Sequence, residues 1–298
     1  MSDKDFKSGF VSIIGRPNVG KSTLLNSILG EKLSIVTSKP QTTRNRITGI
    51  KKVDKGQIVF WDTPGIHKAK DLMNRVMVRA AISTISEVDV IVFVIEANMP
   101  SGGGDDFILN LLKESGKPVI LAVNKIDLIK KSELLPQMER FSTRYSFEAI
   151  VPLSAKSGDG VEELLNVIIE KLAPGPVFFP GDEITDLPER FLVSEILREK
   201  IYSMLRDEVP YSTAVEIEEF SEKESKNVVI IKALVYVERD SQKRIIIGKK
   251  GAMIKEIGSA ARKDIEALLG AKVFLEIFVK VKTGWSSSDR MLKDLGME

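Results

Sequence analysis

A glycine-rich segment near the start of the chain has the residue types and spacing to bind phosphates. It reads Gly15-Arg16-Pro17-Asn18-Val19-Gly20-Lys21-Ser22. The segment follows a predicted strand and opens a predicted helix, as a phosphate-binding loop requires, whereas a chance glycine turn needs neither neighbour. Backbone N–H groups and the positive end of the helix dipole would surround the phosphates. Lys21 would reach the β- and γ-phosphates, and the Ser22 hydroxyl would ligate magnesium.

A second segment places a carboxylate and a glycine directly after another predicted strand. It reads Asp62-Thr63-Pro64-Gly65 and follows the apolar run at 58–61. We expect Asp62 to hold magnesium through water and the Gly65 N–H to contact the γ-phosphate. A turn of these residue types needs no function by itself, so the position after the strand is what favours the functional interpretation.

Two further segments could select the base. Asn124-Lys125-Ile126-Asp127 follows the apolar run at 118–123, and Ser154-Ala155-Lys156 follows the run at 149–153. The Asp127 carboxylate can accept hydrogen bonds from guanine N1–H and the N2 amine, a donor pair that adenine lacks, so we predict GTP rather than ATP. Asn124 would brace the loop, and the stem of Lys125 would cover the base. The backbone of 154–156 would contact guanine O6, which is the weakest of these predictions.

Elements of alternating type must hold these loops together. Short runs rich in β-branched residues lie at 10–14, 58–61, 88–95, 118–123 and 149–153, with helix-like stretches between most of them and an amphipathic helix at 162–172. This alternation predicts an α/β domain with a mostly parallel sheet, and the motifs above make it a P-loop GTPase domain. The carboxyl ends of parallel strands meet at one edge of a sheet, so the four segments should converge there.

A proline- and glycine-rich stretch separates a second domain from the first. The sequence at 173–188 reads APGPVFFPGDEITDLP, which breaks any regular element. Beyond it, helical periodicity at 189–205 and 252–269 and alternation at 212–219, 228–237 and 273–281 predict a smaller α+β domain. We therefore divide the chain into a GTPase domain at 8–174, a linker at 175–189, a second domain at 190–284 and a tail at 285–298. The order of elements in the second domain, together with the glycine loop described next, predicts a type II KH domain.

A Gly-x-x-Gly loop in the second domain has the features of a KH module that binds single-stranded RNA. It lies within the run IIIGKKGAMIK at 245–255, between an apolar segment and a helix. The window 240–263 holds seven basic and two acidic residues, a net charge of +5. A helical joint with a solvated basic tip would also fit the tetrapeptide, and the charge favours RNA. The predicted RNA-binding residues are Ile247, Gly248, Lys249, Lys250, Gly251 and Lys255.

Composition narrows the function classes. The chain has 298 residues, 43% hydrophobic and 29% charged, with a net charge of +2, which is typical of a globular protein of two domains. It contains no cysteine, which excludes disulfides and thiolate metal sites and favours the cytoplasm. No apolar run is long enough to cross a bilayer, and residues 1–7 do not read as a signal or an anchor. We expect a monomer.

The motifs together resemble one family across the whole chain. The first half resembles translation-factor-like GTPases, and GRPNVGKS at 15–22 with QTTRNR at 41–46 resembles the Era family, as does the closing segment FVKVKTGW at 278–285. The resemblance implies a first switch at 41–44 in which Thr43, or as second choice Thr42, closes onto magnesium. It also implies binding near the 3′ end of 16S rRNA, a role in small-subunit assembly and 16S rRNA maturation, and association with the small ribosomal subunit. Peripheral attachment to the inner face of the cell membrane is left open. From the residues alone, 39–41 could be a plain connection.

Hydrolysis is predicted to be slow. Ile66 occupies the place of the water-orienting glutamine of Ras-like proteins, and its side chain cannot hydrogen-bond a water. By resemblance to related GTPases, Asn18 would ligate a potassium ion that supplies the missing charge. The only histidine, His67, is more simply a solvated switch residue than a general base, and Trp285 covers a domain edge or stacks on a base.

The predicted site residues fall into three sets. The catalytic residues are Lys21, Thr43, Asp62 and Gly65. The magnesium ligands are Ser22, Thr43 and Asp62. The nucleotide contacts are Gly15, Arg16, Pro17, Asn18, Val19, Gly20, Lys21, Ser22, Asp62, Thr63, Pro64, Gly65, Ile66, Asn124, Lys125, Asp127, Ser154, Ala155 and Lys156.

Three functions fit these predictions. In the first, GTP orders the switch loops while the KH domain holds RNA, and hydrolysis times the release of that RNA. In the second, the chain is a nucleotide-gated RNA-binding module whose hydrolysis is incidental. In the third, the basic segment binds anionic lipid at a membrane surface.

Overall fold

The computed structural model describes residues 6–37, 39–69, 71–99, 102–223 and 227–297. The chain divides into two compact units, and each is described by itself. The first unit comprises Met1–Ser34, Thr43–Lys70 and Asn74–Asp186, and the second comprises Ile35–Thr42, Asp71–Met73 and Leu187–Glu298. Short pieces of the first half of the chain therefore cluster with the second unit.

A six-stranded sheet forms the centre of the first unit, in the order β2-β3-β1-β4-β5-β6. β2 runs antiparallel to β3, and the other neighbouring pairs are parallel. The strands β1, β3, β4 and β5 are almost entirely buried because helices cover both faces, whereas the edge strand β6 is mostly half-buried. The strands are β1 (Lys7–Ile14), β2 (Ile47–Val53), β3 (Gly56–Asp62), β4 (Val90–Glu96), β5 (Val119–Asn124) and β6 (Ala149–Pro152).

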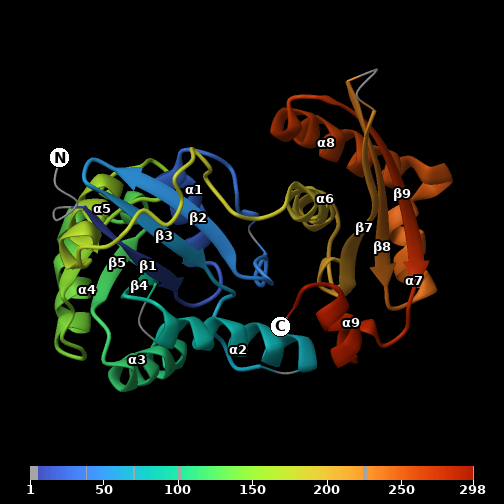
Figure 1. Cartoon of the computed structure of the whole chain (residues 1–298). Helices are drawn as coiled ribbons and strands as arrows, with labels where there is room; N and C mark the ends of the chain where they lie inside the picture. Colours follow the sequence, from blue (N-terminus) through green and yellow to red (C-terminus); the bar gives the residue numbers. More distant parts are fainter. Residues whose placement is uncertain (1–5, 38, 70, 100–101, 224–226, 298) are drawn as a thin grey trace. The chain divides into compact units, whose positions relative to one another are not determined.

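Helices lie on both faces of this sheet (Figure 1). On one face α2, α3 and α4 bury side chains such as Ala81, Leu109 and Phe141 in a single cluster with Phe93 and Leu121 of the sheet. Helices α1 and α5 contact each other, and α1 also contacts β2 and β3. The helices are α1 (Lys21–Leu29), α2 (Leu72–Glu87), α3 (Gly103–Ser115), α4 (Lys131–Ser142) and α5 (Val161–Lys171), with a 3-10 turn η1 (Ile126–Leu128).

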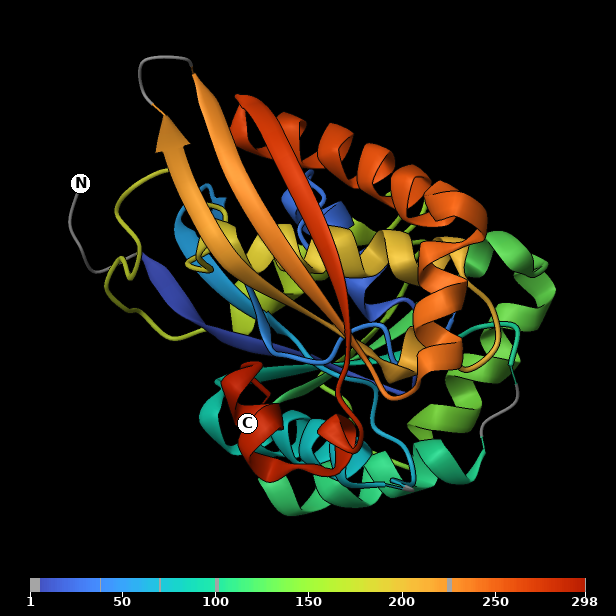
Figure 2. The same cartoon turned by 90° about the vertical axis from the view of Figure 1, so that its right-hand side faces the viewer.

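A smaller sheet of three strands organises the second unit, in the order β7-β8-β9. β7 and β8 are antiparallel, whereas β8 and β9 are parallel. Helices α6 and α8 contact each other and pack against the sheet, as Figure 2 shows from the side of the strands. The elements are α6 (Glu189–Met204), η2 (Pro210–Ser212), β7 (Thr213–Lys223), β8 (Val228–Val237), α7 (Asp240–Ile247), η4 (Lys249–Gly251), α8 (Ala252–Leu269), β9 (Lys272–Val281), η5 (Trp285–Ser287) and α9 (Asp289–Asp294).

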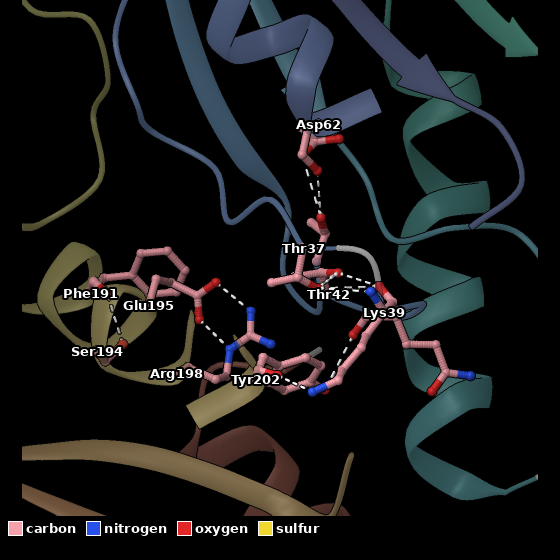
Figure 3. A network of polar contacts seen from close by, with 12 residues as sticks. Thr37, Lys39, Thr42, Asp62, Phe191, Ser194, Glu195, Arg198 and Tyr202 are labelled. Atoms are coloured by element: carbon pink, nitrogen blue, oxygen red, sulfur yellow. Dashed lines mark hydrogen bonds and ion pairs between the residues drawn. The ribbon is translucent and has the colours of Figure 1, made fainter. Parts of the chain in front are cut away.

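The core of the second unit joins one side of α6 and α8 to the inner face of its sheet. Leu197, Ile231 and Ile265 are fully buried in it. Helix α6 also buries an ion pair: the Arg198 guanidinium donates to both carboxylate oxygens of Glu195, at 2.8 and 2.6 Å (Figure 3). The two parallel hydrogen bonds make this a bidentate pair, which offsets part of the free-energy cost of removing both charges from water.

Trp285 is part of this unit's packing. Its side chain is only 1% exposed, and its indole N–H donates to the Ser212 carbonyl at 3.2 Å. Of the two alternatives drawn from the sequence, covering a domain edge fits this position and stacking on a base does not. The predicted tail at 285–298 contains η5 and α9.

The structure confirms the predicted fold class, an α/β domain with a mostly parallel sheet followed by a smaller α+β domain. The predicted strands and helices occur within a few residues of their expected positions, and β2, α7, α9 and the short 3-10 turns were not predicted. β2 escaped notice because Gly49 and two lysines interrupt its apolar alternation. Helix α7 has only two turns, and its last residues read as an apolar run before the glycine loop. Among the described residues no helix is long and apolar enough to span a membrane.

Two residues of α8 offer a matched test of the second unit's core. We expect Ile265→Ala to lower the free energy of unfolding by about 2–4 kcal/mol, because its side chain is fully buried. Leu268→Ala, on the same helix but 41% exposed, should change it by less than about 0.5 kcal/mol. Urea unfolding followed by Trp285 fluorescence in a Trp61→Phe background measures both. Equal effects would contradict the assigned core.

Candidate functional site

The phosphate-binding loop connects β1 to α1, where close backbone approaches require glycine. Gly20 has φ of 99°, and a Cβ at this position would lie 2.2 Å from the Asn124 amide nitrogen. Lys21 is buried, and its ammonium donates to the Gly15 and Arg16 carbonyls at 3.3 and 3.0 Å. The lysine therefore points back into the loop, where its charge can meet a phosphate.

Three oxygen-bearing side chains meet beside this loop. Ser22 Oγ donates to Asp62 Oδ2 at 2.6 Å, Thr43 Oγ1 lies 2.9 Å from Ser22 Oγ, and Thr43 Oγ1 lies 3.5 Å from Asp62 Oδ2. Asp62 is fully buried, and its Oδ1 has no hydrogen-bond partner among the described residues. Hard oxygen ligands around a buried carboxylate with an unused oxygen fit magnesium. The residues predicted to hold that ion are thus brought together.

Burial shifts the pKa values of the two charged residues in opposite directions. Removal from water lowers the pKa of Lys21 to about 8, although the Asp62 charge acts the other way. Removal from water also raises the pKa of Asp62, against the Lys21 charge and the Ser22 and Thr43 hydroxyls. Each shift reflects the cost of a charge in a low-dielectric site. A ligand that brings phosphate charge to Lys21 and a cation to Asp62 would stabilise the charged form of each residue and so offset the cost of burying it.

The geometry distinguishes the two threonines of the predicted first switch. Thr43 lies with Ser22 and Asp62, as described above. Thr42 instead donates from its hydroxyl to the Lys39 carbonyl at 2.9 Å and lies 3.4 Å from Thr37 Oγ1 (Figure 3). Thr43 is therefore better placed than Thr42 to ligate magnesium.

The predicted second switch touches the phosphate-binding loop through its backbone. The Ile66 N–H donates to the Gly15 carbonyl at 3.1 Å, and a Cβ on Gly65 would lie 2.7 Å from Pro17 N. The Ile66 side chain is fully buried in the core of the first unit, so it takes no part in orienting water. His67 is not simply solvated: one ring nitrogen lies 2.8 Å from the Gly65 carbonyl oxygen and the other 3.1 Å from Asn74 Oδ1.

Asn124 joins the base-binding segments to the phosphate-binding loop. Its amide nitrogen donates to the Val19 carbonyl at 2.8 Å, and its Oδ1 accepts from the N–H groups of Lys125 and Ala155 at 2.8 and 2.9 Å. The Ser154 hydroxyl donates to Asp127 Oδ1 at 2.7 Å. One buried amide thus ties together the three loops that carry the predicted nucleotide contacts.

The predicted RNA-binding loop joins α7 to α8. Gly248 has φ of 71°, and a Cβ there would lie 2.6 Å from Met253 Cβ, whereas Gly251 has φ of 81° and open space beside it. Lys249, Lys250 and Lys255 are exposed. The loop therefore presents two adjacent ammonium groups between two glycines with positive φ, and Lys250 itself has a φ of 51°.

A groove of about 360 Å³ lies beside this loop, between α8 and β9. Its lining combines basic and apolar side chains, which suits a ligand with phosphates and flat bases. The lining residues are Ile254, Lys255, Gly258, Ser259, Arg262, Leu275 and Ile277. Of these the sequence predicted only Lys255. The helical spacing of 255, 258, 259 and 262, with a basic residue at each end, was the available signal.

Comparison with known proteins identifies both domains. Residues 10–125 match the family described as 50S ribosome-binding GTPase, and residues 208–286 match the KH domain family. GTPase Era of Geobacter metallireducens is 57% identical over 296 residues, 99% of each chain. GTPase Era of Geotalea uraniireducens is 55% identical over 298 residues, 100% of each chain.

Two solved structures resemble the chain along nearly its whole length. A variant of Aquifex aeolicus Era bound to GDP and AlF4⁻ has a TM-score of 0.95 and 42% identity, covering 98% of this chain and 99% of that chain. Era in complex with MgGDPNP and nucleotides 1506–1542 of 16S ribosomal RNA gives the same values, a TM-score of 0.95 and 42% identity with 98% and 99% covered. The chain belongs to the Era family of GTPases. Its membership confirms the predicted family, the GTPase activity and the KH domain.

Gly65 provides a test of the contact between the second switch and the phosphate-binding loop of this GTPase. Gly65→Ala should lower kcat for GTP hydrolysis at least about tenfold, because its Cβ would lie 2.7 Å from Pro17 N and displace the N–H expected at the γ-phosphate. The affinity for GDP, which lacks the γ-phosphate, should fall by a smaller factor than kcat does. Gly103→Ala is the matched control, since its Cβ meets nothing within 4 Å. Single-turnover phosphate release and GDP titration measure both effects, and an unchanged kcat would contradict the assigned contact.

Proposed function

We propose that this GTPase is a switch whose KH domain holds the 3′ end of 16S rRNA during assembly of the small ribosomal subunit. The observation that carries the switch in this proposal is the joint placement of Ser22, Thr43 and Asp62 beside the phosphate-binding loop, and the glycine loop with the exposed Lys249 and Lys250 supports the RNA partner. The relative solved with MgGDPNP and nucleotides 1506–1542 of 16S rRNA supports the choice of ligands. In this scheme GTP orders residues 41–44 and hydrolysis times the release of RNA.

Magnesium would be held by Ser22 and Thr43 directly and by Asp62 through water. When bound, it supplies positive charge to the β- and γ-phosphate oxygens. Lys21, at the amino end of α1, adds a second positive charge on the same phosphates. The Gly65 N–H donates a hydrogen bond where negative charge grows on the γ-phosphate. Asn124 holds the base loop, and Asp127 accepts from the guanine donors.

Slow intrinsic turnover follows from the residue after Gly65. Because the Ile66 side chain is buried, no side chain at this position orients the attacking water. We propose that a potassium ion ligated by the exposed Asn18 supplies the missing electrostatic help. We also propose the functional boundaries 8–174 and 190–284, with 175–189 as a linker, and a monomeric state.

The basic segment at 240–263 favours RNA over lipid as its partner. Its loop combines two exposed lysines with glycines that admit a close backbone, and an apolar groove lies beside it. Single-stranded RNA offers both phosphates and bases to such a surface, whereas a headgroup layer offers only charge. Peripheral contact with an anionic membrane is kept as an alternative outcome of the RNA experiment below.

Potassium dependence tests the Asn18 assignment. Replacing potassium chloride by sodium chloride at equal ionic strength should slow GTP turnover at least about tenfold, because charge that stabilises the transition state is lost. Asn18→Ala should turn over slowly in both salts and no longer respond to the exchange. Equal rates of the unmodified protein in the two salts would contradict a potassium site.

Charge reversal at the glycine loop tests RNA binding. Lys249→Glu with Lys250→Glu should weaken binding of an RNA that matches the 3′ end of 16S rRNA at least about tenfold, because two phosphate contacts become repulsive. GTP affinity should stay within about twofold. Lys130→Glu with Lys131→Glu is the control, since these adjacent lysines are also exposed but lie in the first unit.

The same variants separate RNA from lipid. Fluorescence anisotropy with the RNA and sedimentation with phosphatidylserine vesicles at physiological salt would be run side by side. RNA binding that survives the 249/250 change would contradict the assigned loop. Vesicle binding that is lost with this change, in a protein that never binds the RNA, would favour the membrane alternative.

A further inference from the structure

Glu96 is a carboxylate at the nucleotide-binding edge of the sheet that the mechanism above does not use. It is the last residue of β4 and pairs in register with Asn124, the last residue of β5. The backbone is fixed here, because the Ala97 N–H donates to the Asn124 carbonyl at 2.8 Å. The Glu96 side chain is 16% exposed. A charged group this far buried needs a partner.

The partner of Glu96 is Lys125. The Lys125 ammonium lies 2.5 Å from Glu96 Oε1 and donates to the Asn18 carbonyl at 2.9 Å. Its backbone is in the left-handed region, with φ of 66°, which turns the side chain from the end of β5 toward the phosphate-binding loop. The Glu96 carboxylate at the end of β4 and the Asn18 carbonyl in the phosphate-binding loop therefore determine where the Lys125 ammonium lies.

A lysine at this position has an alternative partner that would harm base recognition. Asp127 lies two residues further along the same loop, and its carboxylate is the group expected to accept the guanine donors. An unrestrained ammonium two residues away would be attracted to that carboxylate. A Lys125–Asp127 pair would occupy the oxygens that guanine needs and would draw the lysine stem away from the base. Glu96, on the neighbouring strand, offers a competing negative charge in a fixed place.

We propose that Glu96 is a positioning residue for guanine specificity: it holds the Lys125 ammonium against the phosphate-binding loop and so keeps that ammonium from pairing with the Asp127 carboxylate that the base needs. The inference rests on the proposed guanine-binding role of Asp127 and Lys125. Charge-assisted hydrogen bonds are the stronger kind, and a lysine already held in place loses less side-chain freedom when the nucleotide binds. Glu96 thus acts before the nucleotide arrives.

The test compares two nucleotides that differ only at the base. IDP lacks the N2 amine of GDP, so Asp127 can accept two hydrogen bonds from GDP but one from IDP. Glu96→Gln keeps the shape of the side chain and removes its charge. GDP should dissociate about tenfold faster from this variant, and the preference for GDP over IDP should narrow about fivefold, because the diverted Asp127 costs GDP more than IDP. Glu96→Ala should show larger changes in the same direction.

A matched control is available at the opposite edge of the same sheet. Glu148 Oε2 lies 2.6 Å from the Lys171 ammonium, and the Glu148 backbone N–H donates to the carbonyl of Val119 at the start of β5. Glu148→Gln removes one carboxylate from one lysine pair, as Glu96→Gln does, and should leave both nucleotide measurements unchanged. Thermal unfolding of each nucleotide-free variant shows whether a change in affinity reflects a change in folding.

The outcomes separate this inference from the function on which it rests. A wild-type protein that does not prefer GDP over IDP would overturn the assignment of Asp127, and the Glu96 role with it. A wild-type preference that persists in full in both Glu96 variants would overturn the Glu96 role alone, even if both nucleotides bound more weakly. A preference that narrows only in the Glu96 variants supports it.

Discussion

Two opposite charges, Lys21 and Asp62, are buried at one edge of the parallel sheet, and the rest of the nucleotide site depends on them. Burial lowers the pKa of Lys21 to about 8 and raises that of Asp62, so both charges are held at a cost before any ligand binds. A magnesium-bound triphosphate carries the complementary charges. The site is therefore arranged in advance for its ligand, and little reorganisation is required when phosphate charge develops during hydrolysis.

The loops around these charges are held together by hydrogen bonds to backbone. Asn124 bonds to Val19, Lys125 and Ala155, and it lies so close to Gly20 that no larger residue fits there. These hydrogen bonds hold the phosphate-binding loop and the base-binding loops in fixed positions relative to one another. They also explain why Glu96 matters, since a rigid base loop needs each of its charged side chains placed, including those that do not touch the base.

The second unit has an exposed binding surface rather than a buried charged site. The RNA that we propose as its ligand offers many phosphates and flat bases rather than one triphosphate, and recognition of such a ligand needs no buried charge. The exposed Lys249 and Lys250 lie between Gly248 and Gly251, which have positive φ. A groove of about 360 Å³ beside them has Ile254, Leu275 and Ile277 among its lining residues. The apolar core beneath, with Leu197, Ile231 and Ile265 fully buried, keeps this surface in shape.

The sequence by itself determined which chemistry is present and roughly where each element lies. Residue types, their spacing and the strands before them predicted the phosphate loop, the magnesium oxygens, the guanine carboxylate and the glycine loop, because these depend on local backbone geometry. The sequence did not reveal β2, α7 or the burial of Trp285. An interrupted apolar pattern is compatible with more than one type of secondary structure, and a single aromatic residue can be either buried or exposed. Only the tertiary structure showed Thr43 beside Ser22 and Asp62, the burial of Ile66, and the pairing of Glu96 with Lys125. These are pairings between residues distant in the chain, which strand order and register decide and no local pattern encodes.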